Sequence, residues 1–169
     1  VGAVYDDDGG ADRGAVYVLF LNTAGNVLSY QKYSSTLAVM VGALGNLDNF
    51  GEDVCWLGDL DGAGPAVGAI AVGAVGDDDG GLDRGAVYIL FLSSSGSVLS
   101  RKKISDVEGS FTAALLNEDN FGTSVANLGD LDGTGPAVTT LAVGAAGDEG
   151  TGIDRGAVYL LYLDATGKT

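Results

Sequence analysis

The sequence predicts an all-β protein made of tandem copies of one unit. A nearly identical stretch begins at Val1, Val72 and Val143, so the chain repeats itself every 71 residues. Short apolar runs rich in Val, Tyr, Leu and Phe alternate with loops rich in Asp and Gly, as is typical of strands joined by tight turns. No stretch shows a sustained helical period. These three observations favour a repeated set of short strands.

The repeat runs through the whole unit without an insertion. The NFGEDV stretch at Asn49–Val54 recurs as NFGTSV at Asn120–Val125, and GDLDGAGPAV at Gly58–Val67 recurs as GDLDGTGPAV at Gly129–Val138. One supersecondary unit has therefore been copied in tandem. We expect a partial unit, a complete unit and a second partial unit, at residues 1–48, 49–119 and 120–169.

Each unit is expected to hold four short strands. Ala15–Leu21 (AVYVLFL) is a continuous apolar run, which predicts a strand buried on both faces. Val27–Tyr33 (VLSYQKY) alternates and carries a lysine, which predicts an outer strand in partial contact with water. Phe50–Leu57 and Ile70–Ala74 supply the other two strands. Four short strands in a unit of this length are the signature of a propeller blade.

The length of the chain leaves such a propeller incomplete. With 169 residues the chain holds about 2.4 units, whereas a closed propeller needs about 4 to 8 blades. The first unit lacks its Phe-Gly strand and the last lacks its outer strand, so sheet edges stay unpaired. Two arrangements are open: the chain belongs to a longer array, or several copies complete one another. The first residue is Val, and we interpret the chain as a mature chain or an excised segment.

Composition excludes several classes of function. The 23 acidic residues against 8 basic ones give a net charge of −15, and no basic cluster is present, so nucleic acid is not an expected partner. The absence of His and the single Cys exclude serine triads, Cys–His pairs and zinc held by His or Cys. Cys55 has no partner for an intrachain disulfide. No apolar run reaches the roughly 18 residues of a membrane span, so membrane insertion is not expected.

Three recurring motifs resemble those of a known family. Phe-Gly (Phe50-Gly51 and Phe121-Gly122), then GDLDG, then AVGA (Ala71–Ala74 and Ala142–Ala145) resemble the FG-GAP repeat of integrin α-subunit propellers. The longer string VGAVGDDDGGLDRGAVYILFL resembles FG-GAP-like arrays of large secreted and surface proteins of bacteria. The resemblance covers essentially the whole chain. It implies four-stranded blades of the FG-GAP β-propeller type, calcium in blade loops and an extracellular or cell-surface location.

The two DLDG loops are the calcium sites that this resemblance implies. Such a loop offers side-chain oxygens at alternating positions, which suits a cation that takes 6 to 8 oxygen ligands. The fifth position is Ala63 in one copy and Thr134 in the other, where the family prefers Asp, so the second loop is the better site. The alternative is an Asp-Gly turn whose carboxylates cap backbone N–H groups. The candidate ligands are Asp59, Asp61, Asp130, Asp132 and Thr134.

A second acidic cluster precedes each apolar run of the Gly-Ala-Val-Tyr type. In DDDGGAD the carboxylates stand at the first, third and seventh positions, a spacing that could wrap a calcium ion. In the third copy Gly150 replaces one of the spaced carboxylates. The alternative is a solvated turn held by the arginine that follows each cluster. The candidate ligands are Asp6, Asp8 and Asp12 and their repeats Asp77, Asp79 and Asp83.

The sequence favours a protein that is not an enzyme. Nearly every carboxylate lies in a repeated turn, whereas catalytic residues should depart from a repeat; no catalytic residue is therefore assigned. Cys55 is expected to be a small buried residue without redox chemistry, and Trp56 a core or interface residue.

The expected function is an extracellular β-repeat module in cell-surface adhesion or as a surface scaffold, stabilised by calcium. One alternative is a self-assembling subunit of a fibre or ring, whose edge strands pair with neighbouring copies. A third is a lectin-like or protein-binding module that uses the loops at Asn22–Asn26 and Ser93–Ser97 for a protein or glycan ligand. Self-association or contact with neighbouring repeats of a longer chain is expected in the first two cases.

Overall fold

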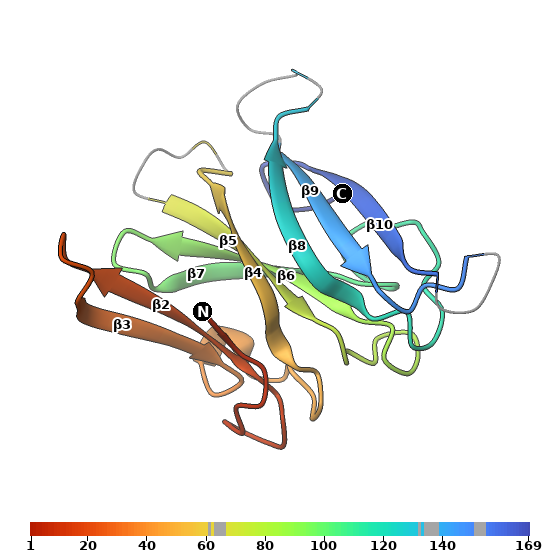
Figure 1. The fold of residues 1–169 in the computed structure, drawn as a ribbon, viewed down its shortest axis with the longest axis horizontal. Coiled ribbons are helices and arrows are strands. Elements are labelled where there is room, and N and C mark those ends of the chain that lie inside the picture. Colours follow the sequence, from red (N-terminus) through yellow and green to blue (C-terminus); the bar gives the residue numbers. More distant parts are fainter. Residues whose placement is uncertain (61, 63–66, 132, 134–138, 151–154) are drawn as a thin grey trace.

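The computed structural model describes residues 1–60, 62, 67–131, 133, 139–150 and 155–169. The described part is all-β apart from one short 3-10 turn at Ala38–Met40. It contains no helix long and apolar enough to span a membrane. The strands form three antiparallel sheets that follow one another in chain order, and none of them closes on itself (Figure 1).

Each sheet is built from consecutive strands. The first sheet has the order β1-β2-β3, the central sheet β4-β5-β6-β7, and the third sheet β10-β9-β8. The central sheet therefore has four strands, and each of the others has three. The bounds are β1 Gly2–Ala3, β2 Ala15–Leu21, β3 Val27–Ser34, β4 Phe50–Gly58, β5 Val67–Ala74, β6 Ala86–Ser93, β7 Val98–Ile104, β8 Phe121–Gly129, β9 Thr139–Ala145 and β10 Ala157–Leu163.

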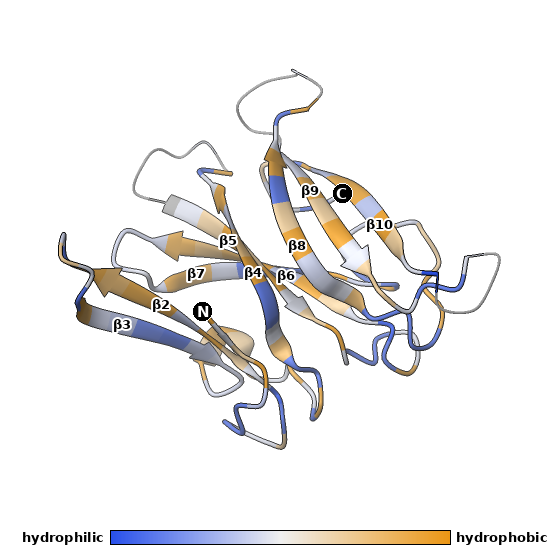
Figure 2. Ribbon diagram, in the orientation of Figure 1, coloured by the Kyte–Doolittle hydropathy of each residue, from blue (hydrophilic) through white to orange (hydrophobic). Residues whose placement is uncertain are grey.

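The predicted strands lie where the apolar runs placed them. Ala15–Leu21 has the predicted bounds, and the other three predicted strands agree with β3, β4 and β5 to within three residues at each end. The repeat is also visible in the pairing, because β5–β6 and β9–β10 share one register: Val72 lies opposite Tyr88, and Val143 opposite Tyr159. Hydrophilic residues gather in the loops at the strand ends (Figure 2).

Two hydrophobic clusters hold the three sheets together, and β6 contributes to both. Tyr88, Leu90 and Leu92 pack in the cluster shared with the first sheet, which we call the first junction. The alternate residues of the strand, Val87, Ile89 and Phe91, pack in the cluster shared with the third sheet, the second junction. Because side chains alternate along a strand, β6 is buried on both faces between its two neighbours.

The prediction of burial on both faces is correct for β6 and wrong for the equivalent strand β2. Val16 faces the first junction and is buried, but Leu19 and Leu21 on the opposite face are exposed. The physical reason is that burial on the second face needs a neighbouring sheet on that side, and the described structure places none against this face of β2. A continuous apolar run in this strand therefore corresponds to burial on both faces only where a neighbouring sheet packs against each face.

Trp56 and Cys55 lie on β4. Trp56 is exposed rather than in the core, its ring lies against Gly68, and its backbone carbonyl accepts a hydrogen bond from Asn127 Nδ2 at 3.1 Å. Cys55 is a half-buried free thiol, and burial raises its pKa to about 11. A thiol with so high a pKa is protonated at neutral pH and therefore a poor nucleophile.

Candidate functional site

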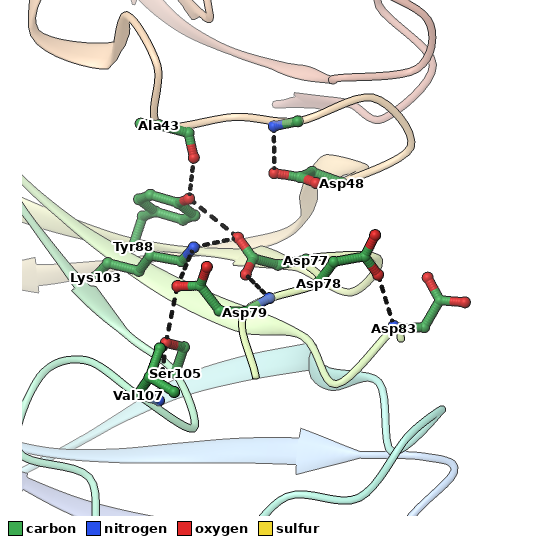
Figure 3. Close-up of polar contacts among 11 residues, drawn as sticks. Ala43, Asp48, Asp77, Asp78, Asp79, Asp83, Tyr88, Lys103, Ser105 and Val107 are labelled. Carbon is green, nitrogen blue, oxygen red and sulfur yellow. Dashed lines mark hydrogen bonds and ion pairs between the residues drawn. The ribbon is translucent and has the colours of Figure 1, made fainter. Parts of the chain in front are cut away.

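The acidic loop between β5 and β6 is the most strongly organised polar site of the described structure. Its own carboxylates cap its backbone: Asp77 Oδ1 accepts the N–H of Asp79 at 3.1 Å, and Asp78 Oδ1 accepts the N–H of Asp83 at 2.9 Å. The N–H of Gly85 closes the loop onto the carbonyl of Asp77 at 3.0 Å. These bonds hold Asp77 and Asp79 on the same side of the loop, where both face β7 (Figure 3).

Lys103 on β7 lies between these two carboxylates. Its Nζ is 2.6 Å from Asp77 Oδ2 and 2.6 Å from Asp79 Oδ2. The side chains of Lys103 and Asp77 are only 7% and 2% exposed. Lys103 pairs with Tyr88 across β6 and β7, which directs its side chain along the Tyr88 ring, with Nζ 5.5 Å from the ring centroid. A single buried ammonium group thus binds two repeated carboxylates of this loop and offsets part of their negative charge.

Hydroxyl groups complete the site. Tyr88 Oη donates to the carbonyl oxygen of Ala43 in the preceding unit at 2.6 Å, and shares its proton with Asp77 Oδ2 at 3.2 Å. Ser105 Oγ donates to Asp79 Oδ2 at 3.2 Å (Figure 3). The lysine, the tyrosine and the two carboxylates therefore form one network that reaches across the first junction.

Burial and charge have opposite effects on the pKa of Lys103 but the same effect on that of Tyr88. Burial alone disfavours the charged form of Lys103, but its hydrogen bonds with Asp77 and Asp79 outweigh that effect and raise its pKa. The pKa of Tyr88 is raised by burial first and then by the charges of Asp77 and Asp48. Both groups therefore stay protonated at neutral pH, which keeps the ion pair intact and the tyrosine a donor.

Asp48 faces the same network from the preceding loop. Burial raises its pKa to about 6, although the N–H of Gly45 donates to Asp48 Oδ2 at 2.8 Å and opposes the shift. Together with Asp77, Arg101 and Lys103 it lines a cavity of about 370 Å³ between the two units. Arg101 Nε also donates to the carbonyl of Val39 at 2.9 Å, which joins β7 to the 3-10 turn of the preceding unit.

The same arrangement recurs in the first sheet, closer to the surface. Lys32 Nζ lies 2.8 Å from Asp6 Oδ2 and 2.7 Å from Asp8 Oδ2, and Ser34 Oγ donates to Asp8 Oδ2 at 3.0 Å. Hydrogen bonds with Asp6 and Asp8 raise the pKa of Lys32, and the bond with Lys32 lowers the pKa of Asp8. Because the Lys32 side chain is 26% exposed, water screens this pair more than the buried one.

In the third unit the tyrosine contact is kept at the corresponding loop. Tyr159 Oη donates to Asp148 Oδ2 at 2.6 Å, and the N–H of Gly150 donates to Asp148 Oδ1 at 2.9 Å. Burial, followed by the bond to Asp148, raises the pKa of Tyr159. The loop thus repeats the Tyr88–Asp77 contact of the central unit.

The structure brings the predicted carboxylates together in pairs rather than in threes. Asp6 lies with Asp8 and Asp77 with Asp79, each pair around a lysine. The third predicted carboxylates, Asp12 and Asp83, have their backbones in the left-handed region, with φ of 47° and 48°. Figure 3 shows Asp83 away from the Asp77–Asp79 pair. Among the described residues no group of three or more Asp, Glu or Cys is placed to hold a metal ion.

The arginines that follow the first two acidic clusters contact residues outside those clusters. Arg84 Nη1 lies 2.5 Å from Asp106 Oδ2, an acid outside the repeated cluster, and its Nε donates to Asn117 at 3.2 Å. Arg13 Nε likewise donates to Asn46 at 2.9 Å. The arginines thus join the loops to the segment that follows, while lysine binds the clustered acids. Sequence reasoning missed the lysines, although Lys32 and Lys103 recur at the same spacing as the acids.

The DLDG loops are described only in part. Asp59 and Asp130 directly follow β4 and β8, and Asp130 Oδ1 accepts the N–H of Gly133 at 2.8 Å, as an Asp-Gly turn requires. The predicted ligands Asp61, Asp132 and Thr134 lie outside the described residues. Calcium binding at these loops stays a prediction.

Comparison with known proteins adds no relative: no protein-family model matches the chain, and a search of curated proteins finds no significant match.

Proposed function

We propose that this protein is an extracellular β-repeat module of the FG-GAP propeller type, without enzymatic activity, that serves in cell-surface adhesion or as a surface scaffold. The observation that carries the proposal is the burial of β6 on both faces between two copies of its own unit. Units that pack on one another through repeated residues build an extended, rigid array whose loops are free to vary.

The acidic clusters support a structural role. Lys103 binds both Asp77 and Asp79 in a buried network, and the hydroxyls of Tyr88 and Ser105 donate to the same carboxylate oxygens. Groups bound in this way stabilise a loop and are not free to activate a substrate. In this proposal, calcium binds the DLDG loops at Asp59 and Asp130, because in the other two clusters a lysine already lies between the paired carboxylates.

A self-assembling subunit is the second candidate. It is favoured by β10, an edge strand in the described third sheet, whereas its equivalents β2 and β6 each pair with a further strand. An open edge with free backbone N–H and C=O groups is a template for another strand. Under this second proposal, copies of the module assemble into a fibre or ring instead of forming part of a long array.

Surface labelling tests the proposed function. Antibodies raised against the folded module should bind intact cells that make it, and protease added outside the cells should remove the signal. The purified module on a solid support should retain such cells, and the Gly73→Ala variant, in which the second junction is disturbed, should retain fewer. Signal found only after the cells are lysed would contradict the proposal.

A further inference from the structure

At both junctions, a Phe-Gly segment lies against two glycines of the preceding unit. A methyl group on Gly2 would overlap the carbonyl oxygen of Gly51, and one on Gly73 would overlap that of Gly122. The other glycine of each pair lies next to the phenylalanine. Gly14 forms a parallel bridge with Phe50, and Gly85 forms one with Phe121. Glycine is required here because the two backbones are in direct contact.

The equivalent glycines of the third unit are uncovered. Gly144 and Gly156 stand at the positions of Gly73 and Gly85, and no neighbouring unit lies near either of them in the described structure. Instead they line a cleft of about 410 Å³ together with Ser124, Ala145 and Val158. The cleft thus lies at the position where the Phe-Gly segment sits at the other two junctions.

An apolar row continues this cleft along β10. Val158, Leu160 and Tyr162 are 70%, 49% and 49% exposed. Their equivalents on β6, which are Val87, Ile89 and Phe91, are buried in the second junction. A row of large apolar side chains exposed on one strand is the mark of an interaction surface. We call the cleft and this row the open face.

We propose that the open face binds the Phe-Gly strand of a further repeat, in the register that β8 adopts on the central sheet. This inference rests on the proposed function. It specifies the partner: an extended segment with phenylalanine above Gly156, then a glycine with positive φ above Gly144, then a valine three residues after the glycine. The φ of Gly51 and Gly122, 102° and 100°, shows why the second position must be glycine.

This chain's own two Phe-Gly segments do not supply the partner. Phe50-Gly51 and Phe121-Gly122 are already seated in the first and second junctions, and both phenylalanines are fully buried. The partner is therefore another repeat of the same chemistry, bound in a parallel contact to Gly156.

A peptide tests the inference. Residues 117–129 of this chain (NEDNFGTSVANLG) contain β8 with its Phe-Gly pair. A fluorescently labelled peptide of this sequence, titrated with the full 169-residue chain, should bind saturably with a rise in anisotropy. A peptide carrying Phe121→Ala should bind at least about tenfold more weakly, because the phenylalanine supplies most of the apolar area that is buried.

The Gly144→Ala substitution in the full chain should block the proposed binding site for the peptide without disturbing the fold. The new methyl group meets only the Ser124 side chain within the chain, which can rotate away, so the melting temperature should stay unchanged. The same methyl group should abolish binding of the peptide, as its equivalent at Gly73 would overlap Gly122. Ser124→Ala is the control and should bind the peptide normally. Equal binding by Gly144→Ala and the unchanged chain would overturn the inference, and so would the absence of saturable binding at millimolar peptide.

A fusion provides a second measurement that does not depend on the affinity of a free peptide. Residues 99–129, appended directly after Thr169, continue the 71-residue register and add one more Phe-Gly strand. The melting temperature should rise relative to a fusion in which the appended copy carries Phe121→Ala. Identical melting temperatures for the two fusions would also overturn the inference. Neither result bears on surface location, so the labelling experiment above can fail or succeed independently.

Discussion

Lys103 and Asp77 form a buried ion pair whose N–O distance is 2.6 Å, and the same pairing recurs in the first unit between Lys32 and Asp6. In the first two units, the lysine comes from the strand that follows the Gly-Ala-Val-Tyr strand and reaches back to the acidic loop. A positive charge carried by the chain itself thus lies between carboxylates whose spacing resembles that of a cation site.

Replacing Lys103 by methionine should destabilise the protein by about 3–5 kcal/mol, because it leaves two carboxylates without their partner in a buried site. Lys32→Met removes the equivalent, more exposed lysine and should cost clearly less. Urea denaturation of the two variants and the unchanged chain measures both effects. Equal and small losses in the two variants would show that the buried lysine is not needed to hold the loop.

Asp48 should make stability fall between about pH 4 and pH 6. Burial raises its pKa to about 6 from the usual 3.8, so within this window the folded chain binds the proton more tightly than the unfolded chain. The contribution of Asp48 is therefore greatest below pH 4, falls as the pH rises, and is constant above pH 6.

Asp48→Asn should remove this dependence, because asparagine keeps an acceptor for the Gly45 N–H and carries no charge. Relative to the unchanged chain, the variant should gain on the order of 2 kcal/mol in unfolding free energy between pH 4 and pH 7. Denaturation curves of both proteins at these two pH values provide the measurement. A difference between the two proteins that stays the same at both pH values would refute the assignment.

Calcium should stabilise the protein through the DLDG loops when it is added back after treatment with a chelator. Millimolar calcium should raise the melting temperature by several degrees through preferential binding to the folded state. Asp132→Ala should remove this gain more completely than Asp61→Ala, because Thr134 offers an oxygen where Ala63 offers none. Scanning calorimetry with and without a chelator measures the gain, and an unchanged melting temperature with no bound calcium in elemental analysis would eliminate the calcium proposal.

Gly73→Ala should be far more harmful than Gly144→Ala, although both change the same position of the repeat. The methyl group at Gly73 meets the backbone of Gly122 across the second junction, whereas at Gly144 it meets only the Ser124 side chain. We expect a loss of more than about 2 kcal/mol for the first variant and little change for the second. Similar melting temperatures for both variants would contradict the proposed role of the glycine in the junction.

The sequence predicted the strands because their signal is local. The run at Ala15–Leu21 and the Asp-Gly turns around it specify a strand and its ends from neighbouring residues alone. The exposure of Leu19 and Leu21 depends instead on which sheets stand next to β2, and no local pattern carries that information.

The candidate site was predicted in part, because the acids were recognised and their partners were not. The prediction grouped three carboxylates in each cluster. In the structure Asp6 and Asp8 share one lysine and Asp77 and Asp79 another, and among the described residues no three such groups are placed to hold a metal ion. Lys103 lies 24 or more residues beyond the pair it binds and reaches it only through the pairing of β6 with β7. A comparison of the repeats for recurring lysines could have identified it.

The mass of the native particle shows whether these units pack on further copies of themselves. Multi-angle light scattering on material purified from the cells that make it, with and without chelator, gives this mass. Because Val158, Leu160 and Tyr162 are exposed where their equivalents are buried, we expect a particle clearly heavier than the 16.9 kDa of this chain. A compact, fully folded particle of 16.9 kDa under both conditions would contradict this expectation.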